Sequence, residues 1–127
     1  MKRFLLDSQV VLWWLDGADR LADRALDAIS QTDVDVLVSV ASVWELTIKA
    51  SSGKLKIDGD LRQHLKEQWF QELPVTGDHA AEVGNLPLHH SDPFDRLLVA
   101  QARCEDLTIV TADRTLSEYD VTILPAN

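Results

Sequence analysis

Short apolar segments alternate with amphipathic segments along the whole chain. The apolar segments are rich in leucine, valine and isoleucine and end at polar or turn-forming residues, a pattern typical of buried β-strands. The expected strands are Arg3–Leu6, Val34–Val40, Leu73–Thr76, Leu107–Val110 and Val121–Leu124, the last of them at an edge of the sheet.

Between these strands, helical patterns are bounded by residues that start and stop helices. The expected helices are Gln9–Leu15, Leu21–Ser30, Val43–Ser52, Asp60–Phe70, Asp78–Val83, one that Pro93 opens, and a short helix or turn over Asp113–Tyr119. Ser8, Ser42 and Asp92 stand where N-cap residues are expected. Glu45 follows Ser42 at the spacing of a capping box, and Pro93 suits the first turn of a helix.

Strands that alternate with helices in this way predict a parallel sheet with helices on both of its faces. The 127 residues suffice for one core of ordinary size, and neither a repeat nor a linker interrupts them. We therefore expect a single α/β domain over residues 1–127, built as a three-layer α/β/α sandwich around a central parallel sheet of four to five strands.

Composition narrows the class of protein. Hydrophobic residues make up 46 % of the chain and charged residues 26 %, as in ordinary soluble globular proteins. Asp7 and Asp16 interrupt the apolar start too early for a signal peptide, and no later segment reaches the ~18 apolar residues of a membrane span. Cys104 is the only cysteine, which excludes an internal disulfide. We expect it to be a small buried residue of a cytoplasmic protein.

The net charge of −9 and the pI near 4.7 argue against a nucleic-acid-binding protein, which usually carries a basic patch. An acidic cytoplasmic protein without such a partner fits the bulk charge better. Bulk charge does not, however, exclude a site at which bound cations neutralise clustered carboxylates. Both interpretations stay open at the level of composition.

Four acidic residues are expected at one edge of the sheet. Asp7 follows the first strand and Asp113 the fourth. Glu45 is expected in the first turn of the helix after the second strand, and Asp95 in the first turn of the helix that leads into the fourth. Ligands bind at the carboxyl ends of the strands in open α/β sheets. Carboxylates gathered there repel one another unless a hard cation such as Mg²⁺ or Mn²⁺ binds them, and such a site can hydrolyse phosphodiesters.

Each of these acids also has a simpler structural interpretation. Asp7 could cap a helix and Asp113 could close a turn. Glu45 could be the partner in a capping box. Asp92 is expected to cap the helix behind it, with Asp95 favourably placed at the positive end of that helix. The shared position at one edge of the sheet is what favours a metal site over these separate roles.

Neighbouring polar residues are weaker candidates. His89 and His90 precede the acids of the proline-opened helix, but adjacent histidines in a loop are more often exposed to solvent than bound to metal, and no histidine or cysteine pair has zinc spacing. The hydroxyls of Ser8 and Thr111 could orient metal-bound water, although capping is the simpler role.

Basic and aromatic residues could contact a nucleic acid. Arg96 and Arg114 flank the acids and could hold phosphate, or form ordinary salt bridges. Trp69 is expected on the inner face of its helix. We expect the tryptophans in the core or in an interface rather than stacked on bases. They are Trp13, Trp14, Trp44 and Trp69.

Four stretches carry a resemblance that covers essentially the full chain in the right order. They read L-L-D-S-Q-V-V-L-W-W-L, S-V-W-E-L-T-I-K, D-P-F-D-R-L-L-V-A-Q-A and I-V-T-A-D-R-T-L-S-E-Y. This combination resembles the PIN-domain ribonucleases, and more narrowly the VapC-type toxins of type II toxin–antitoxin modules. The resemblance implies a PIN-like α/β/α sandwich, Mg²⁺-dependent endoribonuclease activity with Mn²⁺ as a substitute, a homodimer, and inhibition by a cognate antitoxin.

Carried over motif by motif, the resemblance implies that the metal-binding and catalytic acids are Asp7, Glu45, Asp95 and Asp113, with Asp92 as a second choice. Many relatives have threonine and histidine after the first acid, where this chain has Ser8 and Gln9. Serine keeps the hydroxyl, so we expect little effect on metal binding. RNA contact would depend on the metals and on local basic residues. The candidates are Lys49, Lys54, Lys56, Arg96 and Arg114.

Two other functions remain open. Asp7 could be the phosphoacceptor of a receiver-like domain or of a phosphatase, although a phosphatase of the haloacid-dehalogenase type would have a second acid where Gln9 stands. The chain could instead be a non-catalytic module whose groove takes a partner helix. Binding of Mn²⁺ would distinguish the module from the nuclease.

Overall fold

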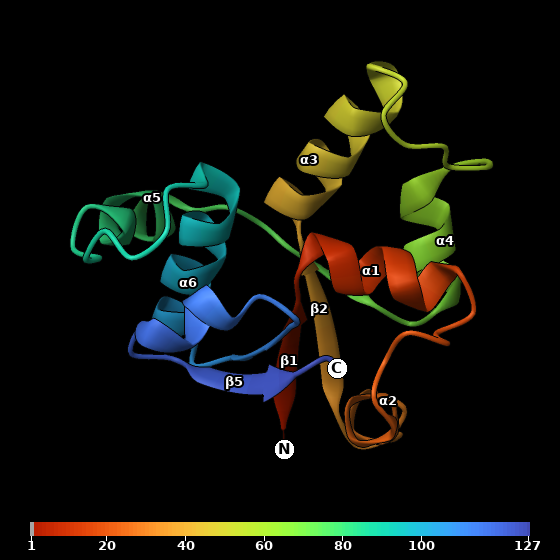
Figure 1. Ribbon diagram of the computed structural model, residues 1–127, viewed down its shortest axis with the longest axis horizontal. Coiled ribbons are helices and arrows are strands. Elements are labelled where there is room, and N and C mark those ends of the chain that lie inside the picture. The colour runs from red at the N-terminus through yellow and green to blue at the C-terminus, as the bar shows by residue number, and fades with distance from the viewer. Residues whose placement is uncertain (1) are drawn as a thin grey trace.

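The computed structural model describes residues 2–127, which form five strands and six α-helices (Figure 1). The strands are β1 (Arg3–Leu6), β2 (Asp35–Ser39), β3 (Gln71–Leu73), β4 (Thr108–Thr111) and β5 (Thr122–Pro125). The helices are α1 (Ser8–Leu15), α2 (Asp23–Ile29), α3 (Val40–Ser51), α4 (Leu61–Glu67), α5 (Gly77–Val83) and α6 (Pro93–Glu105), and a 3₁₀ helix, η1, spans Arg114–Glu118. Every expected strand and helix is present, with ends displaced by up to a few residues.

All strand pairings in the sheet are parallel, in the order β3-β2-β1-β4-β5. The chain moves outward from β1 to β2 and β3, and then returns to the other side of β1 for β4. The carboxyl ends of β1 and β4 therefore flank the point at which the strand order reverses, where ligands bind in open α/β sheets. The parallel α/β sandwich is confirmed, and β5 lies at an edge as expected.

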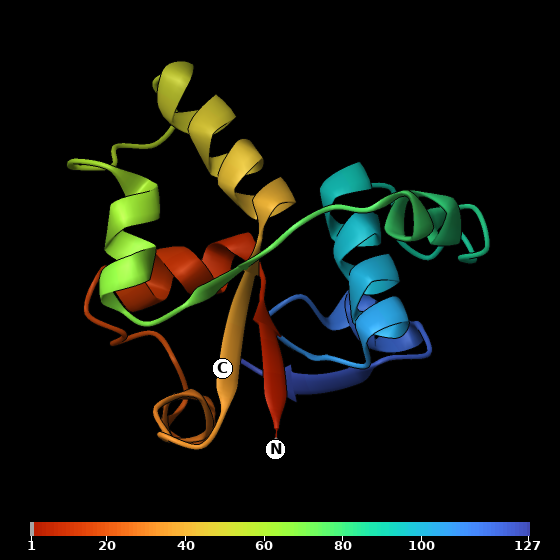
Figure 2. The same ribbon diagram turned by 180° about the vertical axis from the view of Figure 1, so that it is seen from behind.

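Successive residues of the central strand face opposite helical layers, as the twofold period of a strand requires. Phe4 and Leu6 pack with residues of α1, α2 and α4, whereas Leu5 packs with residues of α6 and η1. Viewed from behind (Figure 2), the segment that includes β3 runs from α4 on one side of the sheet to α5 on the other. Leu5 and Leu6 are fully buried, and truncating a leucine in such a site costs about 2–5 kcal/mol.

Helix α3 begins earlier than its sequence pattern indicates. Ser39, the last residue of β2, is still extended and its hydroxyl accepts a hydrogen bond from the N–H of Ala41, so the chain passes directly from strand to helix. The predicted capping box of Ser42 and Glu45 is therefore wrong. Ser42 is buried inside the helix, and Glu45 lies in its second turn rather than its first.

Trp69 is 90 % exposed, so its predicted inward position is wrong. Helix α4 ends at Glu67, and Trp69 follows it with a left-handed backbone (φ 63°). The N–H of Phe70 donates to the carbonyl of Leu65 and the N–H of Trp69 to that of Lys66. This pattern is a Schellman motif, in which the following residue, here the buried Phe70, makes the hydrophobic contact with the helix.

Cys104 is exposed, so the expectation of a buried cysteine is also wrong. The buried face of α6 consists of Leu98 to Ala102, and Arg103 and Cys104 follow on the side that faces solvent. Helix α6, with 13 residues, is the longest. None of the helices in residues 2–127 combines the length and the apolar character that crossing a lipid bilayer requires.

Candidate active site

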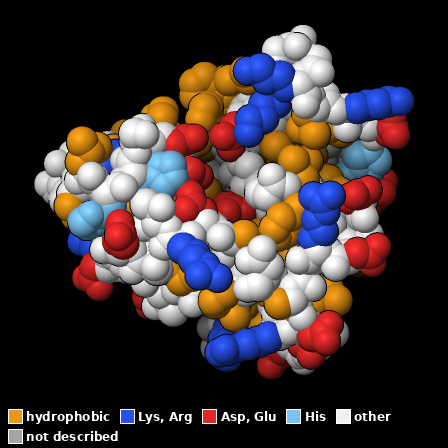
Figure 3. Space-filling model, in the orientation of Figure 1, with side chains coloured by type: hydrophobic (Ala, Val, Ile, Leu, Met, Phe, Trp, Pro, Cys, Tyr) orange, Lys and Arg blue, Asp and Glu red, His pale blue; other side chains and the backbone are white. Residues whose placement is uncertain are grey.

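The structure brings five acidic side chains together around one cavity of about 430 Å³ at the carboxyl ends of β1 and β4. They are Asp7, Glu45, Asp92, Asp95 and Asp113. In the space-filling view (Figure 3), acidic side chains gather with a histidine in the middle of one face of the molecule. Chain order alone places Asp7, Glu45 and Asp113 at a common edge, and the fold places all five acids around a common space.

Asp7 is the most deeply placed of the five acids. It caps α1, because its Oδ1 accepts the N–H of Val10 at 2.8 Å, and its Oδ2 accepts the hydroxyl of Thr111. Ser8, which the sequence indicated as the cap, is instead the first residue of the helix. Burial raises the pKa of Asp7, the bonds from Thr111 and Val10 oppose this, and the charges of nearby acids add to the increase. Its orientation is thus fixed by both neighbouring elements.

Glu45 links the first and third helices. The hydroxyl of Ser8 donates to its Oε1 at 2.5 Å, and Nζ of Lys49, one turn further along α3, lies 3.7 Å from its Oε2. Because α3 starts at Val40, the second turn of the helix rather than the first reaches the cavity. The serine hydroxyl therefore positions a carboxylate.

Asp92 and Asp95 occupy the start of α6. Oδ1 of Asp92 accepts the N–H of Phe94 at 2.8 Å and that of Asp95 at 3.4 Å, so Asp92 is the N-cap, as predicted. Burial raises the pKa of Asp95 to about 7, and repulsion from Asp92 contributes to the increase, while His90 opposes it. Negative charge on Asp95 is therefore costly unless a cation compensates it.

Asp113 caps η1. Its Oδ1 accepts the N–H of Thr115 at 3.0 Å, and its Oδ2 lies 2.8 Å from Nε2 of His90. Burial raises the pKa of Asp113, but the hydrogen bonds from Thr115 and His90 outweigh that effect and hold the pKa below its usual value. The carboxylate of Asp113 therefore both caps η1 and lines the acidic cavity.

His90 belongs to this cluster, although it was a weak candidate from the sequence. Its Nε2 and one oxygen each of Asp95 and Asp113 all lie within 4.8 Å of one another. His89 is exposed at the surface near Glu118, which is the usual situation for a loop histidine. Only the folded chain distinguishes the two, because the loop that carries His90 is held by residues distant in sequence.

Of the two arginines considered for phosphate binding, Arg96 has a structural role. Arg96 donates to the carbonyls of Val83 and Pro87 and to the hydroxyl of Tyr119, so its guanidinium fixes the loop before α6. Arg114 is exposed and does not contribute to the wall of the acidic cavity.

Two other basic residues line that cavity, namely Lys49 and Arg20. Lys49 was a candidate from the sequence. Arg20 was missed, because it lies in the segment after α1, outside the four motifs that carry the acids. Two further lysines from the sequence line cavities beside the acidic one. Lys54 lines a smaller cavity that shares Glu45, Lys49 and Asp92 with the acidic cavity. Lys56, which pairs with Asp58, lines a larger one between α1 and α4.

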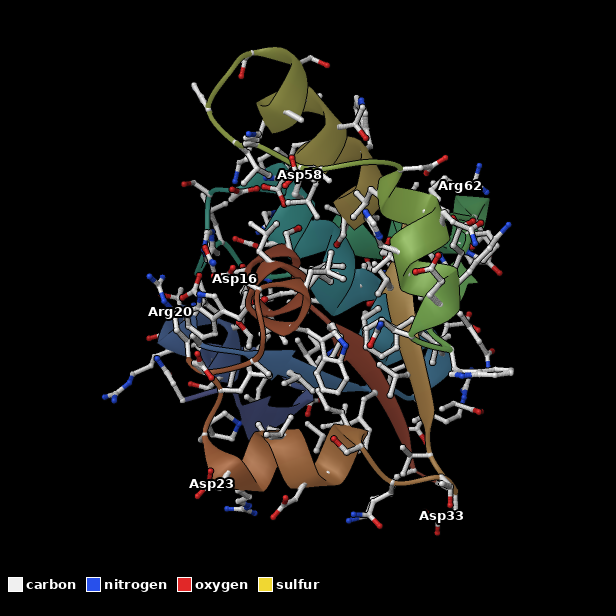
Figure 4. The ribbon with its side chains drawn as sticks, turned by 90° about the vertical axis from the view of Figure 1, so that its right-hand side faces the viewer. Asp16, Arg20, Asp23, Asp33, Asp58 and Arg62 are labelled. Carbon is white, nitrogen blue, oxygen red and sulfur yellow. The ribbon has the colours of Figure 1, made fainter. Side chains whose placement is uncertain are left out.

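A second cavity, of about 630 Å³, lies between α1, α4 and the loop before α4. It shares Leu12, Trp13 and Arg20 with the acidic cavity, so the two are continuous. Figure 4 shows Arg20 and Asp16 in the segment at the end of α1. Trp13 and Trp14 pack against the core and also line this groove, in agreement with a core or interface position.

The donor set of the acidic cavity fits a hard divalent cation. Carboxylate oxygens are the ligands that Mg²⁺ and Mn²⁺ prefer. The raised pKa values of Asp7 and Asp95 indicate that the protein holds these carboxylates at a cost in free energy, which a bound cation would remove. Their assignment as metal ligands stays a prediction.

Comparison with known proteins identifies the family. A model of the PIN domain family matches residues 4–121. The chain is also 30 % identical, over 122 residues, to Ribonuclease VapC22 of Mycobacterium tuberculosis, with 94 % of this chain and 93 % of that protein covered. The chain therefore belongs to the PIN domain family, and the resemblance seen in its motifs is confirmed.

Solved structures share the fold. The chain superposes with a TM-score of 0.74 on a chain of VapBC2 from Rickettsia felis bound to a DNA fragment from the promoter, at 14 % identity and with 96 % and 97 % of the two chains covered. The TM-score is 0.70 with a chain of DNA-bound VapBC from Salmonella typhimurium, at 15 % identity and 98 % coverage of both chains. At such identities these matches support the fold alone.

Proposed function

We propose that this protein is a divalent-metal-dependent endoribonuclease and the toxin of a toxin–antitoxin pair. The observation that carries the proposal is the convergence of Asp7, Glu45, Asp95 and Asp113 around one cavity. These residues would hold Mg²⁺, or Mn²⁺ in its place, which would activate a water molecule and stabilise the leaving oxygen of an RNA phosphodiester. Asp92 is a second choice because the motif resemblance assigns the metal-binding acid to Asp95, and Asp92 is an extra acid beside it.

The side chains around the cavity are oriented before any ligand arrives. Asp7 is held between a backbone N–H and the hydroxyl of Thr111, and Glu45 is held by Ser8. Groups fixed in this way lose little freedom when a ligand binds, which favours binding and catalysis. The hydroxyls considered for orienting water thus orient carboxylates.

Arg20 and Lys49 would receive the phosphates of the substrate. Both line the acidic cavity, where they are the basic residues among five carboxylates. Guanidinium and ammonium groups bind phosphate by charge-assisted hydrogen bonds. The local charge would therefore favour phosphate only once cations are bound to the acids as well.

The groove between α1 and α4 is our candidate site for the antitoxin. It combines apolar and charged lining and opens into the acidic cavity, so a segment bound there would obstruct the substrate. Support also comes from the similar solved structures, which are described as VapBC and toxin–antitoxin complexes. We assign the protein to the cytoplasm, where its RNA substrate and its antitoxin would be made.

Helix α3 carries the surface that we assign to a homodimer. Val40, Trp44 and Ile48 follow one another at intervals of four residues and are 40 %, 62 % and 44 % exposed. Such a stripe lies on one side of a helix, and burying it would remove apolar area from water. Sedimentation analysis of Trp44→Ser tests this, with a shift from dimer to monomer as the expected result.

The phosphoacceptor alternative fits the structure less well. Asp7 is only 6 % exposed and both of its oxygens already accept hydrogen bonds. A phosphoacceptor must present a free oxygen to the incoming phosphorus, whereas a metal ligand can use the second lone pair of a hydrogen-bonded oxygen. The binding-module alternative is distinguished from the nuclease by measuring Mn²⁺ binding and RNA cleavage.

The test is cleavage of a mixed RNA pool by the purified protein in the presence of Mn²⁺, with Asp95→Asn in parallel and calorimetric titration of Mn²⁺ into both. We expect the wild type to cleave and to bind Mn²⁺, and Asp95→Asn to lose both. Asp106→Asn is the matched control, because Asp106 lies outside the acidic cavity and has a left-handed backbone (φ 55°) that asparagine tolerates.

Equal cleavage by the wild type and Asp95→Asn would contradict the proposed site. If the wild type neither cleaves RNA nor binds Mn²⁺, the non-catalytic module becomes the better interpretation.

A further inference from the structure

His90 bridges the acidic side chains and the backbone of the same cavity. Its Nε2 lies 2.8 Å from Oδ2 of Asp113 and 3.2 Å from Oδ2 of Asp95. Its Nδ1 accepts the backbone N–H of Asp92 at 3.0 Å. One imidazole therefore contacts three residues that follow it in sequence and surround the proposed metal site.

These contacts determine which nitrogen carries the hydrogen. A backbone N–H can only donate, so Nδ1 must accept and carries no hydrogen. In a neutral imidazole the hydrogen then lies on Nε2, from which it is donated to Asp113. A cation could bind Nε2 only if the hydrogen left the ring or moved to Nδ1. Moving it to Nδ1 would break the bond from Asp92 and leave two N–H groups facing each other.

The backbone of His90 is fixed independently of its ring. The hydroxyl oxygen of Tyr119 accepts the N–H of His90 at 2.9 Å and that of His89 at 3.2 Å. Arg96 donates to the same hydroxyl at 3.3 Å and to the carbonyl of His90 at 3.4 Å. Tyr119 is only 4 % exposed. The histidine is thus held at both ends and cannot turn freely to offer its other nitrogen.

We propose that His90 is a positioning residue of the proposed nuclease and not a metal ligand. It donates from Nε2 to Asp113 and sets the spacing between the carboxylates of Asp95 and Asp113, which come from different elements and repel each other. Its role depends on the proposed function, but the position of its hydrogen does not. Oδ1 of Asp95 remains available to a cation, and Oδ1 of Asp113, which accepts the N–H of Thr115, keeps a second lone pair.

The first test is long-range ¹H–¹⁵N correlation NMR of the histidine rings in the full chain, without metal and with saturating Mg²⁺. The spectrum of His90→Gln identifies the signals of His90. We expect a hydrogen on Nε2 under both conditions. A hydrogen on Nδ1 in the metal-free protein, or loss of the Nε2 hydrogen to a bound cation, would overturn the proposal.

The second test compares the affinities of two variants for Mg²⁺ and Ni²⁺ by calorimetry. The amide nitrogen of glutamine reaches about as far as Nε2 and keeps the donor, whereas asparagine reaches only as far as Nδ1. We expect His90→Asn to lower the affinities for Mg²⁺ and Ni²⁺ by the same factor, about tenfold. The affinities of His90→Gln should stay within about threefold of those of the wild type.

A ligand would behave differently, because imidazole favours Ni²⁺ over Mg²⁺. Loss of Ni²⁺ affinity in His90→Gln without a matching loss for Mg²⁺ would therefore overturn the proposal. If the wild type binds neither cation, the metal-dependent function is wrong, and the NMR result on the metal-free protein alone decides whether His90 is a donor.

Discussion

Thr111 donates its hydroxyl hydrogen to Oδ2 of Asp7, and so joins the end of β4 to the residue that follows β1. Thr111 is 2 % exposed and Asp7 is 6 % exposed, so water cannot replace this bond. Burial raises the pKa of Asp7, and this hydrogen bond opposes the increase. It therefore helps to keep Asp7 ionised and ready to bind a cation.

Removing this hydroxyl should weaken cation binding in a pH-dependent way. Thr111→Val has nearly the same shape but no donor, so the pKa of Asp7 rises further. We expect Mn²⁺ affinity and RNA cleavage at neutral pH to fall about tenfold and to recover as the pH increases, because the cation competes with a proton. Thr111→Ser keeps the donor and is the control. A pH profile identical to that of the wild type would contradict this account.

The metal-free protein should lose stability as the pH rises from about 4 to about 7. The pKa of Asp95 is raised to about 7 in the folded state, against 3.8 for an ordinary aspartate. Its protonated form therefore stabilises the fold fully at low pH, and that contribution is lost as the pH rises through 7. Asp7, whose pKa is also raised, acts in the same direction.

Thermal denaturation in the presence of EDTA at a series of pH values measures this effect. Asp95→Asn should flatten the curve, because asparagine has no charge to acquire. If the melting temperature of the metal-free wild type is constant over this range, ionisation of these acids does not destabilise the fold as predicted.

Mn²⁺ should reverse this loss, and more strongly at higher pH. A cation that binds the acids stabilises the folded state by mass action and must displace the proton of Asp95 at low pH. The increase in melting temperature caused by a fixed Mn²⁺ concentration should therefore grow as the pH rises through 7. The increase caused by Ca²⁺, which has a larger radius, serves as the comparison. An increase that is independent of pH would place the cation away from Asp95.

Arg20→Gln should impair substrate binding more than the chemical step. Its guanidinium lines the acidic cavity, where it can hold phosphate in the bound substrate. We expect KM to rise about tenfold with kcat little changed, as for the loss of a uniform binding interaction. Arg24→Gln is the matched control, because it changes the net charge equally but lines a cavity at the amino ends of the strands. Equal effects of both variants would indicate only a bulk charge effect.

Trp69→Gly should stabilise the fold. Trp69 has a left-handed backbone, which costs an L-residue about 1–2 kcal/mol, and its side chain is 90 % exposed, so little packing is lost. After allowing for the greater freedom of glycine in the unfolded chain, the free energy of unfolding should increase by about 0.5–1 kcal/mol. Urea denaturation measures it. Trp69→Ala, which keeps the strain, should gain nothing, and a less stable glycine variant would show that the indole ring has a partner in the fold.

Much of this architecture is encoded locally. The alternation of apolar strands with capped helices predicts the parallel α/β sandwich, because each element has its own period and its own end signals. The position of Asp7 and Asp113 after strands follows from chain order, since parallel strands share one carboxyl edge. Asp92 was recognised as a cap because Pro93 follows it.

Tertiary structure decided the rest. The start of α3 at Val40 depends on where β2 ends, and this moves Glu45 from the first turn to the second. Arg20 reaches the cavity only because the segment after α1 folds back over it. His90 is separated from its exposed neighbour by hydrogen bonds to Tyr119 and Arg96, which no local pattern contains. Local sequence sets the elements and their ends, whereas long-range packing and hydrogen bonds decide which side chains meet.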